Sequence, residues 1–138
     1  MPRTYSVRVT ALTLGVMTKW IDNVLSHFVV VGVEQGTKGV ERQLNGEAVL
    51  AISLCRLLSS ELGVPLATAV SIGNHIVRTR TDADGKYEVA PGFSLQFSLT
   101  DIERQLHARL GDASESAPHV RRGRPQRPAW RPGRRSAP

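Results

Sequence analysis

The order of turn and helix signals between Ala11 and Ile72 constrains the fold of this chain more than any other feature. A short helix ended by a glycine is followed by a second helix, a glycine-containing hairpin and two further helices. Glycine is favoured at helix ends and hairpin turns because it adopts positive φ without steric cost. Apolar residues make up 41% of the chain and aromatic residues only 5%, so these elements are expected to pack around an aliphatic core.

The first two helices are predicted by apolar periodicity and by their end signals. We expect a first helix within residues 5–15, capped by Thr4 or Ser6 and ended by Gly15. The second helix is expected from about Met17 to His27. Its apolar residues recur at helical spacing and predict a buried face made of Trp20, Ile21, Val24, Leu25 and Phe28. The opposite face is polar and consists of Thr18, Lys19, Asp22, Asn23 and Ser26.

A hairpin follows the second helix. The β-branched run from Val29 to Val33 predicts one strand, residues 36–39 form the tip, and Val40 to Leu44 is the return strand. A helix-turn-helix followed by a hairpin offers one helix to the major groove of DNA and a basic wing to the backbone beside it. The sequence therefore predicts a winged helix-turn-helix, with helix 17–27 as the reading helix and residues 34–42 as the wing.

The third and fourth helices are marked by caps and breakers. Asn45 is placed as the N-cap of the third helix, which is expected to run to about Leu62 and to stop at Gly63. This helix is apolar around most of its girth, so we expect it to be central to the core or shared with a second subunit. Pro65 opens the fourth helix, which is expected to end near His75.

The segment after the fourth helix is predicted to be mixed. Asp-Gly within residues 82–85 is a strong turn signal. Strands are expected at Ile76 to Arg80, Tyr87 to Val89 and Ser94 to Leu99, with a bend of the chain at Pro91-Gly92 between the last two. Thr100 and Glu103 have the spacing of a capping box, which predicts a helix to about Leu110.

These signals predict a mainly α fold with a small amount of β structure, divided into three parts. Residues 1–75 form the winged helix-turn-helix domain. Residues 76–110 form a β-hairpin with a short helix, and are expected to serve in oligomerisation or partner binding. Residues 111–138 are dominated by Arg, Pro, Gly, Ser and Ala and are expected to be a disordered tail, because they contain too few apolar residues to bury.

The charge of the chain is concentrated in that tail. The net charge is +6 and the isoelectric point is about 10.4. Seven arginines lie in residues 111–138 against Asp112 and Glu115, so this segment carries +5 of the total. The single cysteine, Cys55, allows no internal disulfide and is typical of a reducing compartment. No apolar run reaches the roughly 18 residues of a membrane span, and we expect a cytoplasmic, nucleoid-associated protein without a signal peptide.

Several short motifs in residues 7–75 occur together in one known family. In order they are Gly15-Val16, the helix from Met17 to His27, Gly39 with Arg42, Asn45 with Glu47, and Leu62-Gly63-Val64-Pro65. In this order and spacing the stretch resembles the MerR-like winged helix-turn-helix DNA-binding domains. The chain departs from that pattern in having Asp22 where such domains carry an arginine and Leu44 in place of the aromatic residue of the wing. A hairpin and a short helix stand in place of the long dimerisation helix.

The candidate DNA-binding residues lie in three places. On the second helix they are Thr18, Lys19 and Asn23, of which Lys19 can reach phosphate or guanine and Asn23 can pair with adenine. On the wing they are Lys38 and Arg42, as phosphate contacts. In the tail they are Arg122 and Arg124, in an Arg-Gly-Arg-Pro run similar to the core of the AT-hook, which lies in narrow A·T minor grooves. The alternatives are an ordinary solvated helix face, a hairpin made soluble by charge, and a non-specific polycation.

No pattern in the chain indicates catalysis, a metal or a cofactor. Cys55 lies among apolar residues, and the four histidines match no metal-ligand spacing. The predicted function is a DNA-binding transcriptional regulator of double-stranded DNA, not an enzyme and not a membrane protein, which acts as a homodimer or head-to-tail oligomer. The alternative is a protein-interaction module on the same scaffold, antitoxin-like or adaptor-like, that holds a protein partner through residues 76–110.

Overall fold

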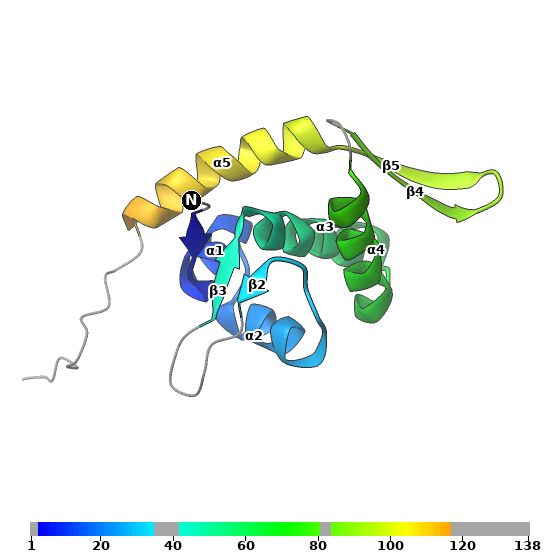
Figure 1. Cartoon of the computed structure of the whole chain (residues 1–138). Helices are drawn as coiled ribbons and strands as arrows, with labels where there is room; N and C mark the ends of the chain where they lie inside the picture. The colour runs from blue at the N-terminus through cyan, green and yellow to red at the C-terminus, as the bar shows by residue number, and fades with distance from the viewer. Residues whose placement is uncertain (1–2, 35–41, 81–83, 117–138) are drawn as a thin grey trace, which may run out of the picture.

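The computed structural model describes residues 3–34, 42–80 and 84–116, which form a mainly helical fold with two small antiparallel sheets (Figure 1). The helices of the described residues are α1 (Val7–Leu14), α2 (Thr18–His27), α3 (Gly46–Leu62), α4 (Leu66–Thr79) and α5 (Leu99–Ser116). One sheet has the strand order β1-β3-β2 and consists of β1 (Thr4–Tyr5), β2 (Val33–Glu34) and β3 (Gln43–Asn45). The other pairs β4 (Asp84–Ala90) with β5 (Phe93–Ser98). The expected fold class, mainly α with a small amount of β structure, is confirmed.

The helix ends follow the capping signals. The hydroxyl oxygen of Ser6 accepts a hydrogen bond from the backbone N–H of Val9 at 3.1 Å, which makes Ser6 the cap of α1. Gly15 ends this helix in the left-handed conformation with φ 68°. The side-chain oxygen of Asn45 accepts from the backbone N–H of Ala48 at 2.9 Å and caps α3. These interactions satisfy backbone groups that a helix end leaves without an internal partner.

Helix α3 is the centre of the core. Nine of its 17 residues are buried: Ala48, Val49, Leu50, Ala51, Ile52, Ser53, Leu54, Cys55 and Leu58. Helix α4 packs alongside it, and a Cβ atom added to Gly73 of α4 would lie 2.8 Å from the carbonyl oxygen of Ala51. Only glycine therefore allows this close approach. Helix α5 packs on α1, and the core cluster includes Leu106 and Leu110 of α5.

A buried asparagine fixes the segment between α2 and β2. Asn74 of α4 is only 7% exposed. Its Nδ2 donates to the carbonyl oxygen of Val29 at 2.7 Å, and its Oδ1 accepts from the N–H of Val31 at 3.0 Å. Gly32 follows with φ +80°, and a Cβ atom there would collide with the capping side chain of Asn45. The expected strand from Val29 to Val33 is therefore wrong at residues 29–32, and within the described residues strand β2 is Val33–Glu34.

The strand predicted at Ile76 to Arg80 is wrong, because helix α4 continues to Thr79. Ile76 and Val77 are buried and continue the apolar face of the helix, so tertiary packing outweighs their β-branched preference. The predicted division between residues 75 and 76 accordingly lies inside α4. The sequence-based end of this helix near His75 was too early.

The C-terminal hairpin has the bend predicted at Pro91 and Gly92, between the two strands expected on either side of it. Gly92 has φ +80°, and Asp84 and Gly85 of the expected Asp-Gly turn lie in β4. β4 extends the strand expected at Tyr87 to Val89, and β5 occupies most of the strand expected at Ser94 to Leu99. Residues 81–83 and the predicted wing tip at 36–39 lie outside the described residues.

Helix α5 begins before and ends after its predicted limits. It starts at Leu99, so Thr100 lies within the first turn and is not the N-cap. The hydroxyl of Ser98 donates instead to the carboxylate of Asp101 at 3.0 Å. The helix continues past Leu110 to Ser116, and Ala113 is buried. Residues 111–116 are therefore helical, and the expected disordered tail from residue 117 onwards lies outside the described residues.

We predict that Asn74→Ala lowers the free energy of unfolding by about 2 kcal/mol. The substitution leaves the N–H of Val31 and the carbonyl of Val29 without their partner, and a buried unsatisfied group costs about 1–3 kcal/mol. Chemical denaturation followed by circular dichroism measures the loss. Ser71→Ala, at an exposed position of the same helix, is the matched control and should change stability by less than about 0.5 kcal/mol. Equal effects of the two substitutions would contradict the role given to Asn74.

Candidate nucleic-acid interface

Helix α2 presents its predicted polar face to solvent. Ile21 and Val24 are fully buried, so the helix is fixed against the core on that side. The exposed residues on the other side are Thr18, Lys19, Asp22, Asn23, Ser26 and His27. The structure thus brings the three candidate residues of this helix, Thr18, Lys19 and Asn23, onto one accessible surface.

The first turn of α2 carries no acidic side chain. Its N-cap is Met17, which offers no side-chain hydrogen bond to the first turn, and that turn contains no acidic residue. The partial positive charge of the helix dipole therefore has no carboxylate opposing it at this end. Backbone N–H groups in such a position are suited to an anionic group such as phosphate.

A cleft of about 580 Å³ lies beside this helix end. It is lined by Gly15, Val16, Met17, Lys19, Trp20, Asn23 and Arg56. Arg56 comes from α3, and its guanidinium carbon lies 5.2 Å from the centroid of the Trp20 ring, a cation–π distance. The cleft therefore joins two cationic side chains, an amide and the uncapped start of α2.

Sequence reasoning missed Arg56 as a member of this surface. Arg56 is the one charged residue in the otherwise apolar or small middle of α3, between Ala48 and Ser60. That isolation was a usable signal, because a charge on a buried helix must emerge at a surface or be paired. Which surface it reaches depends on the packing of α2 against α3, which the sequence alone does not define.

Arg42 lies just before β3 and approaches α2. Its Nη1 is 3.8 Å from Oδ1 of Asp22, with side-chain exposures of 29% and 55%. A solvent-accessible ion pair of this length contributes little to stability. It does place a positive charge beside the carboxylate of Asp22, which would otherwise repel phosphate from this face. The surface formed by α2 and the base of the predicted wing is therefore not dominated by Asp22. Lys38, Arg122 and Arg124 lie outside the described residues.

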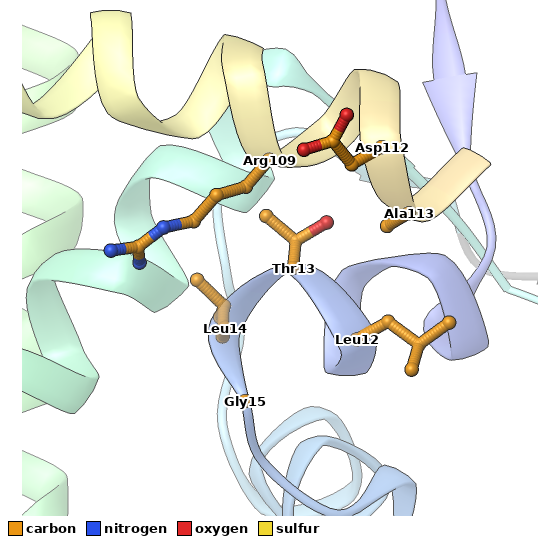
Figure 2. Close-up of a pocket in the computed structure, with 7 residues that line it drawn as sticks. All are labelled: Leu12, Thr13, Leu14, Gly15, Arg109, Asp112 and Ala113. Atoms are coloured by element: carbon orange, nitrogen blue, oxygen red, sulfur yellow. The ribbon is translucent and has the colours of Figure 1, made fainter. Parts of the chain in front are cut away.

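A second cleft, of about 430 Å³, lies between α1 and α5 (Figure 2). Its lining is Leu12, Thr13, Leu14, Gly15, Arg109, Asp112 and Ala113. The guanidinium of Arg109 points away from Asp112 in the close-up, and the hydroxyl of Thr13 is already bonded to the carbonyl of Val9 at 2.8 Å. The polar groups of this cleft do not converge on one point, so it is less suited than the α2 surface to a charged ligand.

Cys55 is a core residue of α3. It is 1% exposed, and burial raises the pKa of its thiol to about 11, an effect that the positive charge of Arg56 opposes. A thiol held in this protonated form is a poor nucleophile and a poor metal ligand. Among the residues that the structure describes, no group of three or more His, Cys, Asp or Glu side chains could hold a metal ion. No helix in the described ranges is long and apolar enough to cross a membrane.

The arrangement around α2 is suited to binding a polyanion. It combines an accessible polar helix face, an uncapped helix start and three cationic side chains, namely Lys19 of α2, Arg56 of α3 and Arg42 just before β3. The chain matches no protein-family model, no curated protein and no solved structure.

We predict that the stability of the protein falls between pH 9 and pH 11 through Cys55. In the unfolded chain the thiol ionises near pH 9.0, whereas in the folded protein it does so near 11. The unfolded state therefore releases a proton that the folded state retains, and rising pH favours unfolding by about 2–3 kcal/mol in total. Urea unfolding across this range measures the slope, and Cys55→Ala should reduce it. Identical slopes for the two proteins would contradict the assignment.

Proposed function

We propose that this chain is a DNA-binding transcriptional regulator in which α1, α2, β2 and β3 form a winged helix-turn-helix related to the MerR-like domains. In this proposal α2 enters the major groove and residues 34–42 form the wing. The observation that carries the proposal is the exposed polar face of α2 with cationic side chains on both flanks, Lys19 and Arg56 on one side and Arg42 on the other. A helix-turn-helix needs such a surface to approach the phosphates.

The roles of the individual residues follow from their chemistry. Lys19, Arg56 and the start of α2 contact phosphates, whereas Asn23 and Thr18 face the base edges. Lys38 and Arg42 add phosphate contacts from the wing. Arg122 and Arg124 add salt-dependent affinity from the tail, because each neutralised phosphate releases counterions. The protein acts in the cytoplasm on the nucleoid as a homodimer or head-to-tail oligomer, with double-stranded DNA as its partner.

A protein-interaction module remains the second candidate, and the hairpin gives it support. Val89 and Phe93 near the tip of β4 and β5 are 45% and 57% exposed, which is a feature of a surface that another protein covers. In this alternative residues 76–110 hold a protein partner and α2 does not contact DNA. Binding of the folded part of the chain to DNA separates the two candidates.

We predict that Lys19→Ala and Arg56→Ala each weaken binding to duplex DNA and lower the salt slope of the affinity by about 1, because each removes one phosphate contact. Fluorescence anisotropy with full-length protein and random duplex DNA over a salt series measures both quantities. Arg104→Ala is the matched control, since it removes the same charge from the exposed face of α5. If the three variants behave alike, α2 is not the binding surface.

We predict that a chain shortened after Ser116 still binds duplex DNA with a clear salt slope. The shortened chain keeps all of α5, including the buried residues Leu110 and Ala113, so its core is intact. Loss of the tail should weaken binding, because residues 117–138 hold seven arginines and no acidic residue, and without them the net charge changes from +6 to −1. Circular dichroism checks that the shortened chain is folded. Complete loss of binding by a folded chain would favour the protein-interaction candidate.

A further inference from the structure

The hairpin of β4 and β5 has two unlike edges. β4 packs against α4 and α5, whereas the main neighbour of β5 is β4. Figure 1 shows the hairpin extending beyond the helices, with β4 nearer to α4. Within the described residues neither outer edge pairs with another strand, so each presents backbone donors and acceptors that a further strand can use.

Only the β4 edge carries the features that prevent strand addition. Its residues include Lys86 and Glu88, and its register shifts between Glu88 and Ala90, which marks a bulge. Charged side chains and bulges are the usual means by which an exposed edge avoids pairing. β5, with the sequence Phe-Ser-Leu-Gln-Phe-Ser, has no charged residue, no proline and no glycine. Six residues are enough for a stable ladder.

The sequence of β5 is also complementary to itself. Phe93, Leu95 and Phe97 alternate with Ser94, Gln96 and Ser98, so one face is apolar and the other polar. Cross-strand neighbours lie on the same face of a sheet. In an antiparallel pair of two β5 strands centred on Leu95, each Phe93 is opposite Phe97 of the second copy, and each Ser94 is opposite Gln96. The apolar face and the polar face both continue across the junction.

We propose that β5 is a homodimerisation edge, which pairs antiparallel with β5 of a second copy of this chain to form a continuous four-stranded sheet. This pairing accounts for the exposure of Phe93, because in the dimer its ring packs beside Phe97 of the second copy. Aromatic cross-strand pairs are among the more stabilising ones. The proposal names the surface used by the expected homodimer and holds whether or not α2 binds DNA.

Sedimentation velocity of the full-length chain, without DNA and at several concentrations, tests this pairing. The wild-type protein should show a dimer whose fraction rises with concentration. Ser94→Lys with Gln96→Lys places two like-charged pairs across the junction and should weaken the dimer by about tenfold or more. Ser94→Lys with Gln96→Glu changes the same exposed positions but places opposite charges across the junction, and should retain the dimer.

A mixing experiment separates repulsion from misfolding. Ser94→Glu with Gln96→Glu should also give a monomer. An equimolar mixture of this variant with the Ser94→Lys, Gln96→Lys variant should form a heterodimer, because each lysine is then opposite a glutamate. A wild-type chain that stays monomeric at all concentrations would overturn the proposal. A dimer that persists in both like-charge variants, or a mixture that does not associate, would overturn it as well.

Discussion

The burial of α3 on nearly all sides is the constraint on which the rest of this structure depends. A helix with apolar residues around most of its girth cannot lie on a surface, so other elements must surround it. Figure 1 shows α3 between α5 on one side and α2 on the other, with α4 alongside. The close approach of α4 is possible only because Gly73 has no Cβ atom to meet the carbonyl of Ala51. The positions of the remaining helices follow from covering this one.

The surface of α2 is a consequence of the same constraint. Ile21 and Val24 fill the core beside α3, and this orientation leaves the polar residues of α2 in solvent. Arg56 leaves α3 on that side and reaches Trp20, so the central helix itself contributes a cation to the candidate interface. The hydrogen bonds of Asn74 then set where the chain leaves α2 and enters β2. The interface and the core are thus fixed by the same few contacts.

The sequence predicted the first three helices and the start of the fourth closely, because these ends carry local signals such as Ser6, Gly15, Asn45 and Gly63. It failed where tertiary contacts outweigh local preference. Ile76 and Val77 stay helical because α3 buries them, and α5 extends beyond Leu110 because it packs on α1. The polar face of α2 was predictable from periodicity, but the contributions of Arg56 and of the Arg42–Asp22 pair were not, since both depend on contacts between distant segments.

The two proposed surfaces, the polar face of α2 and the edge of β5, need different side chains, and they lie on different elements of the chain. DNA contact requires an exposed, polar and cationic helix face, whereas strand addition requires an uncharged edge with regular alternation. α2 and the hairpin lie at different sides of the helical body (Figure 1), so the proposed pairing of two β5 strands would take place away from α2. In the proposed dimer a two-fold axis through Leu95 would relate the two α2 helices, and a two-fold dimer matches a palindromic target. If both proposals hold, the geometry of the β5 edge would set the spacing between the two half-sites, and the residues of α2 would set the sequence read in each.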